Sequence, residues 1–152
     1  MIDRFEQLTY YIYGIYRDIQ KIEKDEMEKQ GLRGAYAQYL LALSRYPDGL
    51  TSARLCEICD KDKAATSRIV SELIESGLVC KADGHTRSYN AKLKLTESGT
   101  EVSKFVMRRT MSAVKFAGNG LSDDDRALMY SSLALIHSNL REICKNVIPE
   151  EE

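Results

Sequence analysis

The stretch that decides the fold is residues 51–99, which read TSARLCEICDKDKAATSRIVSELIESGLVCKADGHTRSYNAKLKLTESG. A helix is expected to begin after Thr51, because a hydroxyl there can accept a hydrogen bond from an otherwise unpaired backbone amide. Residues 60–62 then interrupt the apolar pattern, and Asp62 can cap a second helix. Gly77 is expected to end it, since glycine readily adopts the left-handed conformation of a helix end. The pattern predicts two helices joined by a short turn.

A two-stranded ribbon is expected after the second helix. Leu78 and Val79 open the first strand, and residues 89–95 alternate between apolar and polar side chains, as expected for a strand with one packed face. The polar segment between the strands, residues 82–88, carries Arg87. Two helices followed by such a ribbon have the layout of a winged helix-turn-helix, so the sequence predicts a protein that reads DNA.

These residues resemble the MarR family of bacterial transcriptional regulators. The matching features, in chain order, are Leu55 with the small residue Cys56, the Thr66-Ser67-Arg68 triplet, Leu73 with Gly77-Leu78-Val79, and Leu95-Thr96-Glu97-Ser98-Gly99. With long helices on both sides, the resemblance extends over essentially the whole chain. It implies a mainly α fold with a small β-wing. A winged helix-turn-helix domain (31–99) would follow an N-terminal dimerisation helix (1–30) and precede C-terminal dimerisation helices (100–152).

Size and composition favour one domain with helical extensions. A chain of 152 residues is long enough to bury a core. Its apolar runs fall well short of the roughly 20 residues needed to span a bilayer, and residues 1–4 lack the pattern of a secretion signal. We therefore expect a cytoplasmic protein with no membrane partner. The four cysteines lie inside predicted regular elements, which favours reduced thiols over a disulfide scaffold.

Charge is unevenly distributed, although the formal net charge is only −1. Residues 61–94 hold seven Lys and Arg against four Asp and Glu, a balance of +3, whereas residues 122–152 hold three against seven, a balance of −4. The positive region coincides with the expected second helix and wing. The sequence therefore predicts strongly salt-sensitive DNA binding with weak non-specific affinity.

The second helix and the wing supply the candidate DNA-reading residues. The guanidinium of Arg68 can bond both major-groove acceptors of guanine, and Ala64 can touch a thymine methyl; lysines at the turn can position the helix on phosphates. An ion pair with Glu72, one turn away, is the alternative role of Arg68. Arg87 can enter a narrow minor groove, although His85 stands where the resembled family usually carries an acid. The expected DNA-binding residues are Lys61, Lys63, Ala64, Thr66, Ser67, Arg68, Ser71, His85, Thr86 and Arg87.

The outer segments predict long helices with apolar seams. Apolar residues recur in steps of three and four near both ends of the chain, and Ser122 can cap the last helix. Two-fold dimers are the commonest oligomers, and the resembled family dimerises through these helices. We therefore expect a homodimer on a near-palindromic operator, with an intramolecular bundle as the alternative. The expected dimerisation residues are Phe5, Leu8, Ile12, Ile15, Met129, Leu133, Ile136, Leu140, Ile143 and Val147.

Tyrosines gather in the first third of the chain, where the resembled family often binds small effectors. Aromatic walls with a few hydroxyls suit a planar or phenolic ligand, although interface packing is the commoner role of tyrosines at helical spacing. A small aromatic effector is the expected ligand. The expected effector-pocket residues are Tyr10, Tyr13, Tyr36 and Tyr39.

Cys56 and Cys59 form a C-x-x-C pair, which is typical of redox pairs and half zinc sites. The other cysteines and histidines have no paired spacing, so we expect apolar free thiols, no metal and no cofactor. There is no catalytic triad pattern or Gly-rich phosphate loop, which argues against an enzyme. The favoured interpretation is a dimeric transcriptional regulator that acts as a repressor and is relieved by a small molecule or by oxidation. A winged-helix module that binds a protein partner without binding DNA, and a cysteine-based redox sensor, are the alternatives.

Overall fold

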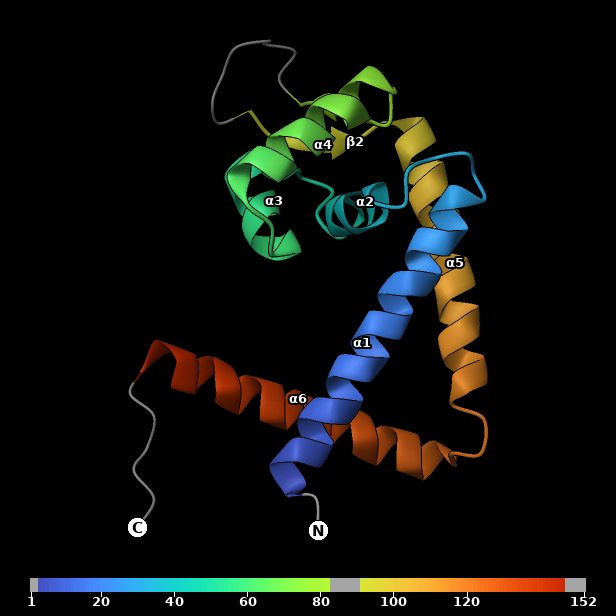
Figure 1. The fold of residues 1–152 in the computed structure, drawn as a ribbon, viewed down its shortest axis with the longest axis vertical. Coiled ribbons are helices and arrows are strands. Elements are labelled where there is room, and N and C mark those ends of the chain that lie inside the picture. Colours follow the sequence, from blue (N-terminus) through green and yellow to red (C-terminus); the bar gives the residue numbers. More distant parts are fainter. Residues whose placement is uncertain (1–2, 83–90, 147–152) are drawn as a thin grey trace. The chain divides into compact units, whose positions relative to one another are not determined.

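A computed structural model describes residues 3–82 and 91–146, except the side chain of Phe5. These residues form a mainly α fold with a small two-stranded sheet, as expected, and they fall into two compact units, residues 1–114 and 115–152. The elements, shown in Figure 1, are α1 (Arg4–Glu28), α2 (Tyr36–Ser44), α3 (Ser52–Cys59), α4 (Lys63–Glu75), β1 (Val79–Lys81), β2 (Leu93–Leu95), α5 (Glu97–Ala117) and α6 (Asp123–Lys145).

Two side-chain caps build the helix-turn-helix. The hydroxyl of Thr51 accepts a hydrogen bond from a backbone amide in the first turn of α3, at 3.2 Å, and the carboxylate of Asp62 does the same for α4, at 2.7 Å. Between them, Asp60 adopts a left-handed backbone with φ 50°, which ends α3 abruptly. Gly77, with φ 71°, follows the end of α4. The predicted caps at Thr51 and Asp62 and the predicted stop at Gly77 are confirmed.

Helix α2 is the centre of the core. Seven of its nine residues are buried, as expected for an apolar helix surrounded by packing partners. Leu55 of α3, Leu73 of α4 and Val106 of α5 are fully buried in the same cluster. The core therefore fixes α3 and α4 against α2, which positions the outer face of α4.

The two strands pair antiparallel at the base of the wing. Leu50 adds a bridge to Leu93, with backbone hydrogen bonds of 3.1 and 2.8 Å in the two directions. Ala91 and Leu93 are buried and Lys92 is exposed, which confirms the predicted alternation in this part. Strand β2 begins at Leu93, later than the sequence predicted, and residues 83–90 lie outside the described part of the chain.

A tight junction fixes the start of α5 near the end of α4. The hydroxyl of Thr96 donates to the carbonyl of Gly77 at 2.6 Å and accepts from the amide of Gly99 at 3.1 Å. A Cβ atom at Gly99 would lie 1.9 Å from the carbonyl oxygen of Leu78. Only glycine allows this close backbone approach. The segment that ends the wing therefore sets the direction in which α5 leaves it.

Helix α1 joins the core through its last turns. Met27 is fully buried there. The buried carboxylate of Glu26 accepts hydrogen bonds from Lys29 at 2.6 Å and from Arg109 of α5 at 3.3 Å. The amino-terminal part of α1, in contrast, exposes most of its side chains. The helix lies within residues 1–30, the segment in which the sequence predicts an N-terminal helix.

The second compact unit contains α6 and the turn that precedes it. The hydroxyl of Ser122 accepts from the amide of Asp125 at 3.1 Å, and the Asp125 carboxylate accepts from the amide of Ser122 at 3.2 Å. This reciprocal capping box confirms the predicted cap. No residue of α6 is buried in the described chain, although the helix carries a predicted apolar seam.

Candidate nucleic-acid interface

The outer face of α4 is a ridge of short polar and basic side chains. Most of the predicted contact residues on this helix are exposed, whereas Ile69, Val70 and Leu73 are buried beneath them. The helical period of 3.6 residues separates the two faces. Lys61, in the turn before the helix, is also exposed. The exposed residues of this α4 ridge are Lys63, Ala64, Ser67, Arg68 and Ser71.

Thr66 is an exception to the predicted set. It is only 1% exposed, and its hydroxyl lies 3.4 Å from the hydroxyl of Tyr39 on α2, where either can donate. The prediction that Thr66 contacts DNA from the free face is therefore wrong. Its spacing from Ile69 and Leu73, three and seven residues on, is the signal that could have placed it on the buried face.

Arg68 is exposed and makes no ion pair with Glu72, the alternative role considered for it. The Glu72 carboxylate instead pairs with Arg33 and accepts from the Tyr36 hydroxyl at 3.2 Å. The Arg33 guanidinium also lies 5.9 Å from the centre of the Tyr36 ring. Burial, and then the Glu72 carboxylate, raise the pKa of Tyr36 above its usual value. This Arg33–Tyr36–Glu72 cluster ties α4 to the start of α2 and leaves the Arg68 guanidinium unpaired within the described residues.

A hollow of about 450 Å³ runs between α3, α4 and the strands. Ser67 and Ser71 of the α4 ridge contribute hydroxyls to it, as do Thr51 and Ser52 at the amino end of α3. Hydroxyl and ammonium groups are typical phosphate contacts in protein–DNA complexes. The remaining residues that line the hollow are Ala53, Cys56, Lys63, Thr66, Val70, Ile74, Lys81, Ala91 and Leu93. Sequence reasoning missed Thr51 and Ser52 because the approach of α3 to α4 is a tertiary contact.

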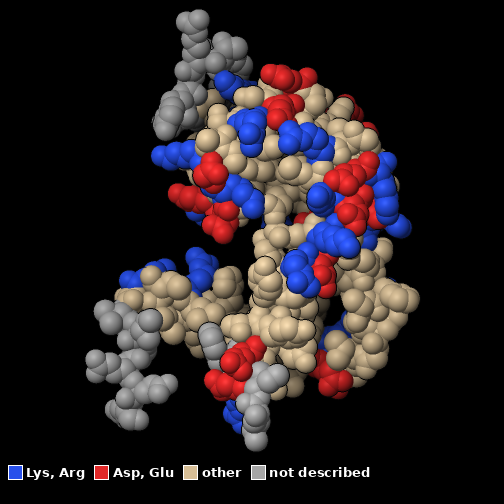
Figure 2. All heavy atoms as spheres, in the orientation of Figure 1, with Lys and Arg blue, Asp and Glu red and all other residues tan. Residues whose placement is uncertain are grey.

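Basic side chains occur over the winged-helix region, interspersed with carboxylates (Figure 2). The exposed basic groups nearest the α4 ridge in sequence are Lys61, Lys63 and Arg68. The basic balance of residues 61–94 also depends on Arg87, which lies outside the described residues together with His85 and Thr86. The described interface is thus a modest basic surface, with its charges at the turn and the first turns of α4.

The cysteine thiols of α3 occupy different surroundings. Cys56 is half-buried and donates to the Lys61 carbonyl at 2.6 Å. Cys59 is buried and donates to the Gln38 carbonyl at 3.8 Å. Burial raises the pKa of Cys59 to about 11, so its reactive thiolate form is scarce at neutral pH. Cys80, which is exposed on β1, faces Lys94 across the strand pair.

The predicted dimerisation residues that the structure describes are exposed or half-buried on α1 and α6. Ile12 and Ile15 of α1 and Leu140 of α6 are exposed. Along the lower half of α1, Figure 2 shows mainly uncharged side chains. Val147 lies outside the described residues, as does the side chain of Phe5. Among the other predicted residues, Met129 and Leu133 are exposed, and Leu8, Ile136 and Ile143 are half-buried.

The structure does not bring the four predicted effector tyrosines together. Tyr10 and Tyr13 project from α1 with exposed fractions of 74% and 67%, whereas Tyr36 and Tyr39 are buried in the core. Neither of the two described cavities is lined by any of the four. The hydroxyls of Tyr36 and Tyr39 instead contact α4 residues, as described above.

Other kinds of site find little support in residues 3–82 and 91–146. These ranges contain no group of three or more His, Cys, Asp or Glu side chains that could hold a metal ion. Within the same ranges, no helix combines the length and the apolar character that a membrane crossing requires.

Comparison with known proteins adds independent findings on the family and the fold. The model of the MarR family matches residues 30–88, which contain α2, α3, α4 and β1. No curated protein is significantly similar to this chain.

Similar solved structures span nearly the whole chain. A MarR family transcriptional regulator from Silicibacter pomeroyi is 21% identical over 98% of this chain and 97% of its own, with a TM-score of 0.74. A MarR family protein from Listeria monocytogenes, complexed with a 26mer DNA, is 20% identical over 100% of both chains, with a TM-score of 0.73. MepR, a transcription regulator of the Staphylococcus aureus multidrug efflux pump MepA, is 16% identical over 87% of this chain and 97% of its own, with a TM-score of 0.63. These likenesses establish the fold, a winged helix with flanking helices.

Proposed function

We propose that this chain, whose residues 30–88 match the model of the MarR family, is a sequence-specific repressor of that family that binds double-stranded DNA as a homodimer. The α4 ridge is the observation that carries the proposal. Its outward residues are short or flexible, its opposite face is buried in the core, and the Arg68 guanidinium pairs with no carboxylate among the described residues. A helix of this kind can enter a major groove while its buried face stays packed against the core.

The proposed contacts follow from the position of each side chain along α4. Lys61 and Lys63 bind phosphates at the turn, while Ser67 and Ser71 reach phosphate or base edges from the hollow beside α3. Arg68 reads guanine, because a guanidinium can bond its N7 and O6 together. The wing residues His85, Thr86 and Arg87 extend the proposed interface along the duplex. Ala64 is small enough to let the helix approach the bases closely.

The structural neighbour from Listeria monocytogenes supports this assignment. It shares the fold along its entire length and is complexed with a 26mer DNA. A duplex of that size covers about two and a half turns at roughly 10.5 base pairs per turn, enough for two recognition helices in successive major grooves. We propose that this chain also binds a duplex, with α4 in the major groove.

The homodimer rests on the exposed apolar seams. Ile12 and Ile15 on α1, and Leu133 and Leu140 on α6, are exposed in the single chain. Exposed seams of this kind mark protein interfaces when they are contiguous, and identical chains most often associate about a two-fold axis. Two copies then read the two halves of a near-palindromic operator.

Selection from a random pool of duplex DNA tests the proposed function. Purified protein should enrich one near-palindromic sequence, and its affinity for that sequence should fall steeply with salt, since each phosphate contact adds about 0.9 to the slope of log affinity against log salt concentration. A winged-helix module that binds only a protein partner would enrich nothing. Peroxide treatment before the selection separates a redox sensor, which would lose enrichment, from a regulator that does not use Cys56 and Cys59.

A further inference from the structure

One carboxylate on α4 stands within reach of the arginine that we assign to guanine. Residues three and four positions apart are neighbours on a helix surface, and an arginine pairs readily with a carboxylate at that spacing. The residues at these positions around Arg68 are Ala64, Ala65, Ser71 and Glu72, of which Glu72 is the only acid. The Glu72 side chain is 26% exposed, which leaves it room for another rotamer. The availability of the Arg68 guanidinium therefore depends on where Glu72 points.

In the structure, Glu72 points toward α2. Its Oε2 atom accepts hydrogen bonds from the guanidinium of Arg33, in the segment before α2, and, at 3.2 Å, from the hydroxyl of Tyr36. The same guanidinium lies 5.9 Å from the centre of the Tyr36 ring, a distance at which cation and ring attract each other. Of the two donors, Arg33 carries the charge, and charge-assisted hydrogen bonds are roughly twice as strong as neutral ones. Arg33 is thus the main restraint on the Glu72 carboxylate.

Helix α2 has contacts with α4 that do not depend on Arg33. The hydroxyls of Tyr39 and Thr66 lie 3.4 Å apart, and both side chains are buried. Leu73 of α4 is fully buried in the core cluster to which α2 contributes most of its residues. Burial of such apolar side chains contributes more to stability than an ion pair with an exposed partner. A substitution at Arg33 should therefore release Glu72 without releasing α4 from the core.

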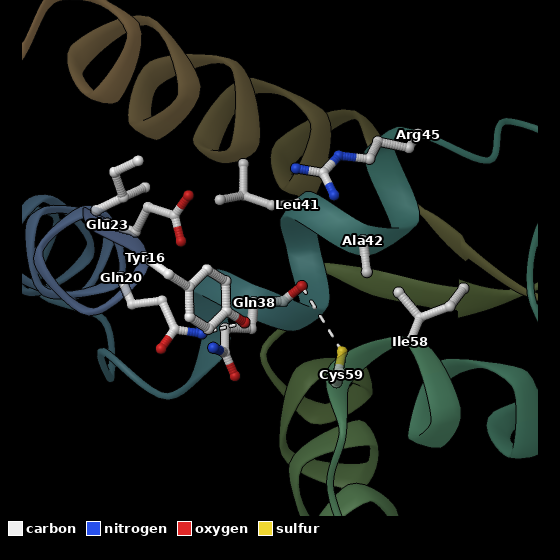
Figure 3. Close-up of a pocket in the computed structure, with 10 residues that line it drawn as sticks. Tyr16, Gln20, Glu23, Gln38, Leu41, Ala42, Arg45, Ile58 and Cys59 are labelled. Atoms are coloured by element: carbon white, nitrogen blue, oxygen red, sulfur yellow. Dashed lines mark hydrogen bonds between the residues drawn. The ribbon is translucent and has the colours of Figure 1, made fainter. Parts of the chain in front are cut away.

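The opposite face of α2 borders a second cavity, of about 230 Å³, between α1, α2 and α3 (Figure 3). The helical period places this face away from Tyr36 and Tyr39. The residues of α2 that line this α1–α2–α3 cavity are Gln38, Leu41 and Ala42. Neither Arg33 nor Glu72 belongs to the lining. A change at Arg33 thus acts on the α4 side of α2 and leaves the lining of the cavity in place.

We propose that Arg33 is a positioning residue of the recognition helix: it holds the Glu72 carboxylate against α2 and so keeps the Arg68 guanidinium available to guanine. The inference rests on the proposed function, because it concerns how the same α4 ridge reads DNA. Arg33 acts through Glu72 and needs no contact with the duplex. Without Arg33, Glu72 competes with guanine for Arg68 at an i,i+4 spacing. Operator affinity and the preference for guanine then both fall.

Operator affinity in a double-mutant cycle tests this role. Arg33→Gln should weaken binding to the selected operator by about 2- to 5-fold, the range of a partly exposed ion pair that competes for Arg68. Glu72→Gln alone should bind at least as tightly as the wild type, because it removes the competitor and keeps an acceptor for the Tyr36 hydroxyl. The Arg33→Gln/Glu72→Gln double variant should regain wild-type affinity. In an Arg68→Ala background, Arg33→Gln should have no further effect.

Discrimination between bases separates this role from a merely structural one. Replacement of each operator guanine in turn identifies the position at which Arg68→Ala loses its preference. Arg33→Gln should reduce the preference at that same position, and the Arg33→Gln/Glu72→Gln double variant should restore it. The matched control is Arg17→Gln, which removes an exposed arginine that pairs with Asp18 on α1. It should leave both the affinity and the base preference unchanged.

Two results in these binding measurements would overturn the inference. If Arg33→Gln weakens binding equally with and without Glu72→Gln, then Arg33 contacts the DNA itself. If Glu72→Gln alone weakens binding as much as Arg33→Gln does, then the Arg33–Tyr36–Glu72 cluster acts only as a structural support of α4.

Nuclear magnetic resonance of the DNA-free protein provides a readout that needs no operator. The Nε–Hε signal of Arg68, identified by its absence in Arg68→Ala, should move in Arg33→Gln as the guanidinium gains the Glu72 carboxylate. It should return to its wild-type position in the Arg33→Gln/Glu72→Gln double variant. An Arg68 signal at the same position in all three proteins would overturn the inference. A wild-type protein that enriches no DNA would instead refute the proposed function, and the Arg68 signal would still decide whether Arg33 controls Glu72.

Discussion

At the scale of single residues, Glu72 determines what Arg68 is free to do. The two stand four residues apart on α4, a spacing at which an intrahelical ion pair is expected. Glu72 is instead engaged by Arg33 and Tyr36, which come from outside the helix-turn-helix. The cluster therefore stabilises the position of α4 and at the same time removes a competitor for the arginine that we assign to DNA.

Substitution of Glu72 tests whether the Arg33–Tyr36–Glu72 cluster stabilises the fold. Glu72→Ala should lower the free energy of unfolding by about 1 kcal/mol, the usual net contribution of one hydrogen bond with a modest surface ion pair. Glu75→Ala is the matched control, because Glu75 is an exposed carboxylate on the same helix; its effect should stay within about 0.5 kcal/mol. Urea denaturation measures both. Equal effects of the two substitutions would mean that the cluster contributes nothing to stability.

Single residues also show what the sequence could predict. Thr51, Asp62 and Ser122 were identified as caps because a cap acts on amides two or three residues away. The burial of Thr66 was missed, although its helical spacing contained the signal. The partnership of Glu72 with Arg33 could not be predicted, because the two are separated by 39 residues and only the packing of α2 against α4 brings them together.

At the scale of elements, the junction between the wing and α5 depends on one glycine. Gly99→Ala places a Cβ 1.9 Å from the Leu78 carbonyl oxygen. Forced overpacking of this kind typically costs about 1–3 kcal/mol. We expect a loss of that size in the free energy of unfolding, whereas Ser98→Ala, at the exposed neighbouring position, should change it little. Thermal or urea unfolding that does not distinguish the two variants would contradict the junction described here.

The stabilisation that the Glu26 carboxylate provides at the end of α1 should depend on pH. The hydrogen bond from Lys29, and to a smaller extent Arg109, hold the pKa of Glu26 below its ordinary value of 4.5. A carboxylate with a lowered pKa stabilises the fold above its ordinary pKa, and this contribution is lost as pH falls through the pKa of the folded protein.

Unfolding free energies measured between neutral pH and the acid range therefore test this contribution of Glu26. The stability of the wild-type protein should decline more steeply below pH 4.5 than that of Glu26→Gln. Glu101→Gln, at an exposed position of α5, should retain the slope of the wild type. A Glu26→Gln protein with the same acid slope as the wild type would show that the carboxylate is not held by these two cations.

Helices and strands were predicted well where the sequence signal is local, as with caps and apolar periodicity. They were predicted less well where contacts with distant segments set their bounds. The long α1, α5 and α6 follow from apolar periodicity and caps. The start of β2 was misplaced, because pairing with β1 and Leu50, not strand propensity, sets where the ladder begins. The α1–α2–α3 cavity was beyond sequence reasoning, since its walls come from three helices that only tertiary packing assembles.

At the scale of the whole molecule, the exposed apolar seams of α1 and α6 predict that the chain forms a dimer. Ile15→Glu adds a charge to an apolar position of α1 that is 59% exposed in the single chain. Burial of an unpaired charge at an interface is costly, so the variant should sediment as a monomer at concentrations at which the wild type is a dimer. Glu101→Lys, a charge reversal on exposed α5, should remain dimeric. A wild-type protein that sediments as a monomer would refute the proposed homodimer.

Operator affinity in a matched pair of arginine variants tests most directly that the outer face of α4 reads DNA. Arg68 lies on the ridge, whereas Arg108 is exposed on α5, 5.7 Å from the centre of the Phe105 ring. Arg68→Ala should weaken binding to the selected operator by about 1–3 kcal/mol, or roughly 5- to 150-fold, with its helical circular dichroism unchanged. Arg108→Ala should bind nearly as well as the wild type. Equal affinities of the two folded variants would contradict the assignment of the α4 ridge as the recognition surface.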